Sequence, residues 1–377
     1  MRREPEPLLP RTKGSALISG VEGELTLGVD AEGRITAEFV SESPVADSKE
    51  WLDTRGLRDI AGTLGDGRAI ALRQCALTDW TFALDGESGP RFELELLPKS
   101  ITIVSSTGSP SRTEFAVVNE RVTLRGNLRF DGFDMDVRPA DPDAGGHAGL
   151  AKGKPSWITH WASVATPDLA AEREAVEVVE CLAYTLSLLT MERVVVPLRR
   201  VLDAQGEEIR WEFKLTRWPV HSGRSTLYAR DVGDALRVVG RSDVRRRFCK
   251  LGLKRYVGYL LGAWRDDIFV ELRLACVLFA LESLGASWFL ADGCSPEEVA
   301  KRSIIAKLGR INSCLRFIPR KYKSDWLRDD LRNPLVHTGA VPLMTPAQVH
   351  EATEELLVLA VDIFFRILGF ERPTALG

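Results

Sequence analysis

The sequence has few of the residues on which metal and disulfide chemistry depend. It contains six cysteines with no CxxC spacing, and its five histidines form no HxH or HExxH pair. Zinc sites and disulfide frameworks both need close, regular spacing of such residues. We therefore expect reduced thiols, no metal site and no bound cofactor.

Long apolar runs and phosphate-binding loops are also absent. No stretch of about 18 apolar residues runs without a charge, and no apolar run follows the first three residues. We therefore expect neither a membrane span nor a secretion signal, and a cytoplasmic location. No GxxxxGK[ST] loop occurs, which argues against nucleotide hydrolysis by that route. The formal net charge is -3, so a nucleic-acid surface would have to be a local patch.

The first part of the chain, residues 1–150, has the pattern of a β-rich domain. Residues 24–29 and 34–40 alternate apolar and polar around a turn at 30–33, which predicts a β-hairpin. Further strands are expected at 57–63, 68–75, 91–97, 100–105, 113–117 and 121–136. Many short strands separated by glycine-rich turns favour an antiparallel sandwich or a partly open barrel.

A second segment, 156–228, combines a helix with a hairpin. It follows a stretch at 139–155 that is rich in glycine and proline and is expected to be a linker. The helix is expected over 167–190, with Thr166 as its cap and Pro167 at the first helical position. Strands at 193–202 and 208–216 follow, joined by a turn at 203–206. We expect this segment either to pack on the β-domain or to close it.

Residues 229–377 change to a helical pattern. Helices are expected at 241–263, 266–290, 296–308, 310–317 and 346–369, with a shorter one beginning at Pro334. The 266–290 helix is apolar on nearly all sides and is therefore expected at the centre of a bundle. The fold class is α+β, with a β-rich N-terminal domain and an all-α C-terminal domain.

The segment before the last helix carries an Arg/His pair, in the sequence Arg332-Asn333-Pro334-Leu335-Val336-His337. In a regular helix these two side chains would point about 140° apart. Asparagine is a preferred N-cap and proline suits the first helical position. We therefore expect a helix that begins at Asn333, with Arg332 just before it and His337 at its fourth position, where the two side chains can meet.

This arrangement suits chemistry on a phosphodiester. A helix N-terminus attracts phosphate, Arg332 would add a permanent charge, and His337 can exchange protons near neutrality. Attack of an RNA 2′-OH on its own phosphate needs those functions and no metal. The alternative is ordinary capping, with Arg332 paired to Asp325, Asp329 or Asp330.

The six residues resemble the Arg-Asn-x-x-x-His signature of the HEPN superfamily of ribonucleases, and the resemblance covers about 229–370. It implies a metal-independent endoribonuclease acting on RNA, usually a homodimer that joins its helical domains so that both motifs face one cleft. By position, His337 would be the acid/base, Arg332 the phosphate ligand and Asn333 the residue that orients the motif. Residues 59–64 and 69–72 are similar to the β-rich region of ApeA-type anti-phage proteins, which implies a role in defence.

Glu282 lies in the apolar helix 266–290 and is a further candidate for the site. A carboxylate is costly to bury without a partner, so it is expected to pair with Arg332 or position His337. The alternative is that Glu282 faces solvent or a second subunit.

A basic stretch precedes the motif. Residues 299–324 contain eight lysines and arginines and no acidic residue. Such a local excess fits contacts with an RNA backbone, for which the candidates nearest the motif are Arg316, Arg320, Lys321 and Lys323. The alternative is a solvated basic face.

Two other functions remain open from the sequence. In the first, the helical domain keeps the HEPN-like fold without catalysis and binds a nucleotide or a protein. In the second, the β-domain is the functional part, a ligand receptor with a dimerising helical tail.

Overall fold

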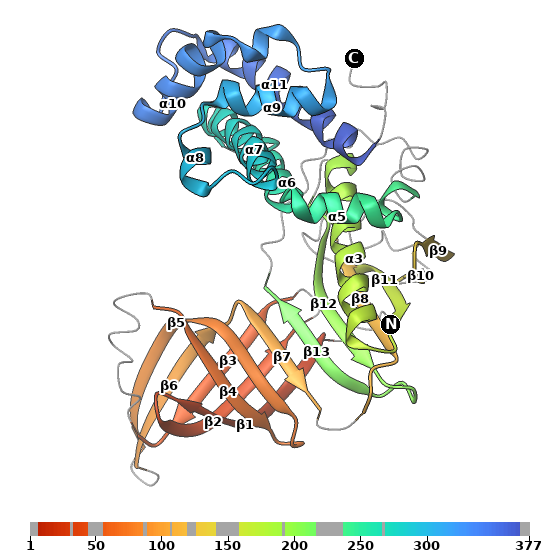
Figure 1. Cartoon of the computed structure of the whole chain (residues 1–377). Coiled ribbons are helices and arrows are strands. Elements are labelled where there is room, and N and C mark those ends of the chain that lie inside the picture. Colours follow the sequence, from red (N-terminus) through yellow and green to blue (C-terminus); the bar gives the residue numbers. More distant parts are fainter. Residues whose placement is uncertain are drawn as a thin grey trace, which may run out of the picture. The chain divides into compact units, whose positions relative to one another are not determined.

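The computed structural model of the chain consists of a β-rich unit and a helical unit (Figure 1). It describes residues 7–30, 33–43, 56–85, 89–105, 108–118, 126–140, 158–190, 193–215, 237–265 and 268–369. The first unit comprises Met1–Asn127, Asp134–Ala175 and Val195–Pro219, and the second comprises Leu128–Phe133, Val176–Val194 and Val220–Gly377. The α+β class is therefore as predicted. The described residues of the predicted middle segment, 156–228, are shared between the two units.

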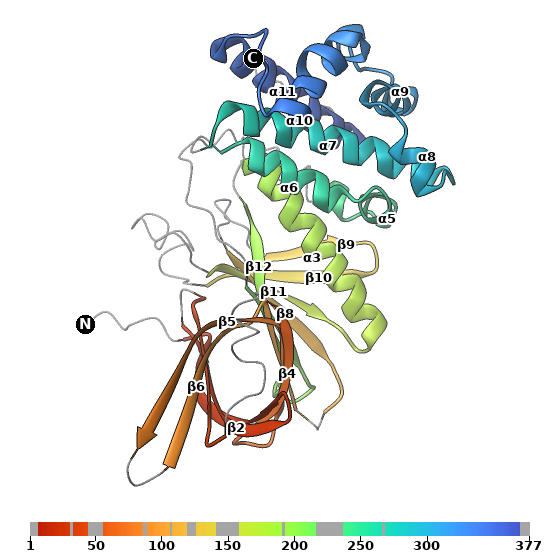
Figure 2. The ribbon, with the colours of Figure 1, turned by 90° about the vertical axis from the view of Figure 1, so that its left-hand side faces the viewer.

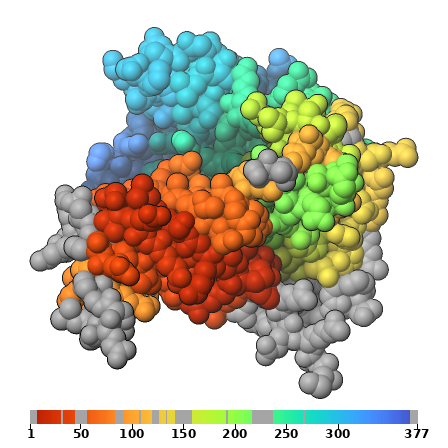
Figure 3. Space-filling view, turned by 90° about the horizontal axis from the view of Figure 1, so that it is seen from below, coloured from red at the N-terminus to blue at the C-terminus, as the bar shows by residue number. Residues whose placement is uncertain are grey.

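The first six strands form a closed antiparallel barrel (Figure 2). They are β1 (Leu9–Ile18), β2 (Val21–Val29), β3 (Ile35–Ser41), β4 (Arg58–Leu64), β5 (Ala69–Asp85) and β6 (Gly89–Leu97). Strand β4 pairs with β1 along one edge and with β5 along the other, which completes the ring. Side chains of these strands make one continuous surface on the face seen in Figure 3. Of the two architectures that the sequence allowed, the barrel is observed, and it is closed.

Apolar side chains at alternate positions of the strands fill the interior of this barrel. Leu25 and Leu27 of β2 and Phe39 of β3 are fully buried, whereas their neighbours Thr26 and Glu38 are partly exposed. Each such side chain stabilises the fold by roughly 1.5–3 kcal/mol relative to an exposed one. The predicted hairpin of 24–29 and 34–40 is therefore confirmed, and its apolar face lines the core.

The sheet continues beyond the barrel from β5. Its further strands run in the order β7 (Ser100–Val104), β13 (Glu208–Lys214), β12 (Val195–Leu202), β8 (Arg112–Val118), β11 (Ile158–Ala165), β10 (Phe133–Pro139) and β9 (Gly126–Phe130). The predicted hairpin 193–202 and 208–216 is present as β12 and β13, inserted between β7 and β8.

Several strands differ from the prediction. Strands β1 and β11 were not predicted. The predicted strand 121–136 is divided by a turn at Asp131 and Gly132 into β9 and β10, and its residues 121–125 lie outside the described residues. Of the predicted linker 139–155, only Pro139 and Ala140 are described, and Pro139 ends β10.

Helix α3 (Leu169–Thr190) begins two residues later than predicted. The Asp168 carboxylate accepts hydrogen bonds from the backbone N–H groups of Ala170 and Ala171, at 2.9 and 2.8 Å. Asp168 is therefore the capping side chain, in place of Thr166, because two free N–H groups of the first turn point at it.

The described helices of the second unit are, besides the rest of α3, α5 (Ser242–Lys250), α6 (Leu253–Ala263), α7 (Val270–Ala291), α8 (Pro296–Ala300), α9 (Ile304–Leu315), α10 (Asn333–Thr338) and α11 (Pro346–Leu368). The predicted helix 241–263 is broken at Gly252, whose φ of 60° lies in the left-handed region. Helices α8 and α11 begin with capping boxes at Ser295 and Thr345, each followed by proline. Helix α9 merges parts of the two predicted helices 296–308 and 310–317.

Helix α7 is the central helix of this unit, as predicted. It contacts α6, α9 and α11, and its Leu274, Val277 and Leu281 are fully buried. By length and apolar composition alone, α7 also meets the criteria for a membrane span, which the core helix of a bundle satisfies equally. It carries two charges that are held inside the unit. Arg273 contacts Glu354 at 2.5 Å and Glu282 contacts Arg332 at 2.8 Å.

Candidate functional site

The Arg/His motif lies within a continuous helical segment, not at a helix start. A π-helix, Trp326–Arg332, runs directly into α10, and both Arg332 (φ -68°, ψ -50°) and Asn333 (φ -65°, ψ -47°) have helical backbone angles. The predicted N-cap at Asn333 is therefore wrong. The predicted phosphate site on free N–H groups at Asn333 is lost with it, because those groups belong to a helix interior.

Glu282 and Arg332, fifty residues apart in sequence, meet in this unit. The Arg332 Nε donates to the Glu282 carboxylate at 2.8 Å, and both side chains are largely shielded from solvent, with 29% and 18% of their surface exposed. Arg332 is thus one of the two partners predicted for Glu282. The alternative of Arg332 pairing with nearby aspartates is not observed, since Asp325 and Asp329 contact Arg328.

Asn333 holds the other side of the Arg332 guanidinium. Its Oδ1 accepts from Arg332 Nη1 at 3.3 Å, while its Nδ2 donates to Asp329 at 3.4 Å. Arg332 is therefore fixed at two of its nitrogens. An arginine has five N–H donors, so donors remain for a further ligand.

Lys307 of α9 is a third charged group at this site. Its Nζ lies 3.9 Å from the Glu282 carboxylate, and the side chain is 10% exposed. In the sequence analysis Lys307 counted only as one of the eight basic residues of 299–324. Gly285, one turn after Glu282, allows this contact, because a Cβ there would lie 2.4 Å from the Lys307 Cβ. In the sequence, this glycine three residues after Glu282 was the one sign that another helix packs closely here.

His337 stands apart from this cluster. Its side chain is exposed on α10, and it makes no hydrogen bond or ion pair with the described residues. No hydrogen bond joins it to Arg332 or Glu282 within the part of the chain that the structure describes. One chain therefore brings Glu282, Arg332, Asn333 and Lys307 together. His337, which is close to Arg332 in sequence, is exposed and does not join them.

The basic stretch is less available to a ligand than its composition indicates. Lys321 pairs with Glu355 at 2.8 Å, and this hydrogen bond raises the pKa of Lys321. Arg310 similarly pairs with Asp292. Arg316, Arg320 and Lys323 make no ion pair with described residues, and the first two are exposed. These three remain the RNA-contact candidates with uncommitted charge.

The described residues contain no group of three or more His, Cys, Asp or Glu side chains placed to hold a metal ion. Cys75 and Cys181 are buried, and burial raises the pKa of each thiol to about 12. Both thiols are therefore protonated and unreactive near neutral pH.

Comparison with known proteins assigns no family. No family model matches the chain, and no curated protein matches it. Among solved structures, the chain is similar to a type VI secretion system effector from Yersinia pestis, with 15% identity, a TM-score of 0.22, and coverage of 25% of this chain and 90% of the other. It is also similar to Hcp1 from Flavobacterium johnsoniae, with 11% identity, a TM-score of 0.18, and coverage of 24% and 94%. Both TM-scores are too low to bear on fold or function.

Proposed function

We propose that the helical unit is a HEPN-like bundle and that the protein is a metal-independent endoribonuclease. The observation that carries this is the Glu282–Arg332 contact. It fixes the arginine of the motif inside the unit while leaving guanidinium donors unused. The exposed His337 lies on α10, the helix that follows. A fixed arginine with free donors suits a phosphodiester, because a preorganised fork loses little entropy on binding.

The proposed reaction is an internal transfer at phosphorus. The RNA 2′-oxygen forms a bond to the adjacent phosphorus as a base takes its proton, and the bond to the 5′-oxygen breaks as an acid protonates that oxygen. The products are a 2′,3′-cyclic phosphate and a 5′-hydroxyl. Arg332 stabilises the charge on the phosphoryl oxygens, and His337 supplies one proton-transfer role.

The second proton-transfer group is proposed to come from a second copy of the chain. One described chain offers a single histidine beside Arg332, and a homodimer through the helical unit would supply another. Val336 and Leu343, on either side of His337, are 44% and 80% exposed. Exposed apolar side chains at a polar site favour contact with a protein surface. We also propose a role in anti-phage defence, which rests on the sequence resemblance alone.

The test uses a short RNA labelled at its 5′ end and incubated with the full chain in excess chelator. Cleavage should continue without metal and yield a cyclic phosphate, and a 2′-deoxy substitution at the cleaved position should abolish it. His337→Ala and Arg332→Ala should each lose activity by at least about a hundredfold. His350→Ala, which changes an exposed histidine elsewhere in the unit, is the matched control and should retain full activity.

A second candidate is a HEPN-like module that binds a nucleotide or protein without cleaving. The observation in its favour is that His337 has no partner among the described residues to fix its tautomer, which catalytic histidines usually have. Absence of RNA cleavage by the wild type would favour this candidate over the ribonuclease. Cleavage that is equal in wild type and His337→Ala would refute the catalytic role of His337.

A further inference from the structure

Three arginines of the β-rich unit converge on one buried glutamate, Glu114 of β8. Its carboxylate is 4% exposed and accepts hydrogen bonds from Arg200 Nη2 at 2.6 Å and from Arg138 Nη2 at 3.2 Å. The Nε of Arg112 lies 3.8 Å from the same carboxylate. Arg200 comes from β12, Arg138 from β10 and Arg112 from β8, so three strands of one sheet bring the guanidiniums together. Burial of a carboxylate without a cation is costly, which accounts for at least one of these contacts.

The guanidiniums are held in place but keep donors for a ligand. The Arg200 guanidinium lies over the Trp161 ring of β11, 4.5 Å from the ring centroid, which restricts its orientation. Arg112 and Arg138 are 49% and 58% exposed, and neither makes a further hydrogen bond with described residues. An arginine has five N–H donors, so each of these two presents unused donors to solvent.

The charge of these four side chains, which we call the Glu114 cluster, is not balanced. In the part of the chain that the structure describes, Glu114 is the one carboxylate in ion-pair contact with the three arginines. Glu208 of β13 is near Arg200, but its ion pair is with Arg68, at 3.5 Å. Three positive charges therefore share one negative charge. The excess lies on the exposed arginines, where an anion can reach it.

The alternative is that the arginines only brace the sheet. The opposite face of the sheet shows such bracing, because Arg199 and Arg210 there contact Glu172 and Glu212. Two cations match two carboxylates, and all four side chains are largely shielded from solvent. That pattern needs one arginine for each carboxylate. The Glu114 cluster has two more than this, so bracing does not account for its composition.

We propose that the Glu114 cluster binds a phosphate monoester, with Arg112 and Arg138 donating to its terminal oxygens and Arg200 contributing its charge. A phosphate monoester carries a charge of about -1.5 to -2 at neutral pH and has three strong acceptor oxygens. Arginine forks match such oxygens geometrically, and several forks can bind one phosphate at once. A single carboxylate, with two oxygens and one charge, would match the cluster less well. The site lies in the β-rich unit and does not depend on RNA cleavage.

Calorimetric titration of the full chain, in a buffer without phosphate or sulfate, measures this binding directly. The probes are inorganic phosphate and phenyl phosphate, with nitrate as a control anion of single charge. Both phosphates should bind, and nitrate should bind at least about tenfold more weakly, because it offers less charge to the same donors. Tighter binding of phenyl phosphate would assign the site to a phosphate group on a larger molecule, and equal or tighter binding of inorganic phosphate would assign it to the free ion.

Variants of the two exposed arginines test the contacts. Arg112→Gln/Arg138→Gln keeps the Arg200 contact for the fold but loses two charge-assisted contacts, and should bind phenyl phosphate at least about tenfold more weakly. Arg112→Lys/Arg138→Lys keeps both charges but loses both forks, so its affinity should lie between those of the glutamine variant and the wild type. The lysine variant decides the test if the glutamine variant does not fold. Arg73→Gln removes an exposed arginine of β5 that pairs with Asp59, and should bind as wild type.

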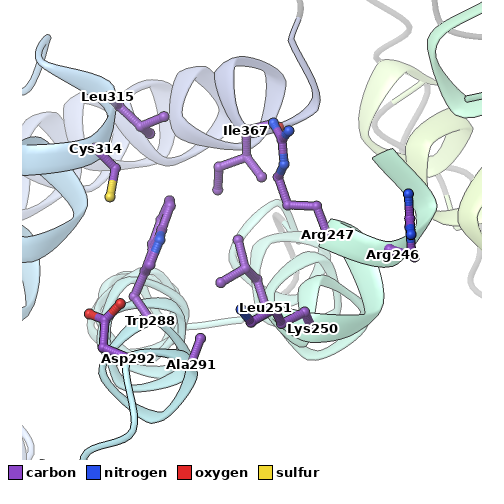
Figure 4. Close-up of a pocket in the computed structure, with 10 residues that line it drawn as sticks. All are labelled: Arg246, Arg247, Lys250, Leu251, Trp288, Ala291, Asp292, Cys314, Leu315 and Ile367. Carbon is purple, nitrogen blue, oxygen red and sulfur yellow. The ribbon is translucent and has the colours of Figure 1, made fainter. Parts of the chain in front are cut away.

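The helical unit provides a control for the location of binding. It contains a cavity of about 460 Å³ that Arg246, Arg247 and Lys250 line on one side (Figure 4). Arg247 donates to the Ile367 carbonyl at 2.8 Å, and Lys250 interacts with Asp292. Two of these three cations therefore already have partners. Arg246→Gln/Lys250→Gln should leave the affinity for phenyl phosphate unchanged.

Three results would overturn the proposal. One is the absence of binding by both phosphates, or binding of nitrate as tight as that of phosphate. Another is wild-type affinity in the glutamine and lysine variants of Arg112 and Arg138. The third is a loss of affinity in Arg246→Gln/Lys250→Gln, which would assign the bound phosphate to the helical unit instead.

Discussion

Replacing Glu282 by glutamine should destabilise the helical unit more than replacing either of the cations that Glu282 contacts. Glu282 is the carboxylate shared by Arg332 at 2.8 Å and Lys307 at 3.9 Å. Removing it leaves two largely buried positive charges side by side with no carboxylate between them. Removing Arg332 leaves Glu282 with Lys307, and removing Lys307 leaves it with Arg332.

The sizes of these effects follow from burial. The side chains of Arg332, Glu282 and Lys307 are 29%, 18% and 10% exposed, so solvent screens the cluster only in part. Leaving such charges unpaired should cost about 2–3 kcal/mol in Glu282→Gln. Arg332→Gln loses one charged hydrogen bond and should cost about 1 kcal/mol, and Lys307→Met should cost less than about 1 kcal/mol. The double change Glu282→Gln/Arg332→Gln should cost less than the sum of its parts, because only one cation is then unpaired.

Urea unfolding followed by far-ultraviolet circular dichroism measures these differences, because most of the helix signal comes from this unit. Glu355→Gln is the matched control, since its partner Lys321 is 53% exposed and the pair should contribute less than about 0.5 kcal/mol. The reasoning is refuted if Arg332→Gln destabilises as much as Glu282→Gln, or if the double variant is strictly additive.

Two further predictions concern packing and pH. At Gly62 of β4 a Cβ would lie 2.2 Å from the Ser15 carbonyl oxygen, so Gly62→Ala should weaken β1–β4 pairing and lower the melting temperature. Gly258→Ala in α6, where a Cβ would meet nothing within 4 Å, should stabilise the protein by up to about 1 kcal/mol. Equal shifts of the melting temperature in thermal scans of the two variants would contradict this. Burial raises the pKa of Cys181 from 9.0 to about 12. Between those values the unfolded chain binds fewer protons than the fold, so stability should fall as pH rises, by about 2 kcal/mol at about pH 10.5. Urea titrations across this range should show a shallower fall for Cys181→Ala, and identical slopes would rule the assignment out.

How far the fold follows from the sequence depends on how clearly burial alternates. The β2–β3 hairpin was predictable because its apolar residues alternate on either side of a polar turn. Strand β1 was missed because its LPRTKGSALI sequence has four polar residues between Pro10 and Ala16, and three of them are exposed. Its strand structure comes from pairing with β2 and β4, which no local pattern encodes. Closure of the barrel through β4 and β5 likewise depends on contacts between strands.

In the candidate site, too, a local pattern predicted one contact, whereas contacts that depend on packing between elements were missed. The cost of burying a carboxylate in an apolar helix was sufficient reason to expect a cation at Glu282, and Arg332 is there. Lys307 was not assigned to the cluster because its place depends on how α9 packs on α7. Only Gly285 hints at that packing from sequence. The spacing of residues along the chain does not predict contacts that depend on how helices pack.

The π-helix before α10 explains why the predicted helix start at Asn333 is wrong. Proline was taken to start a helix because its ring meets the carbonyl four residues earlier and it has no N–H to donate. Both constraints weaken when the preceding turn is widened to a π-helix, which here spans Trp326–Arg332 and ends one residue before Asn333. The helix can then pass through Pro334, and Arg332 points at Glu282 in place of lying outside a helix start. A π-helix costs stability through poorer hydrogen bonding, so it persists only where the surrounding packing fixes it. In this unit the buried Leu327 and Leu331 on the π-helix and the Arg332–Glu282 contact are what fix it.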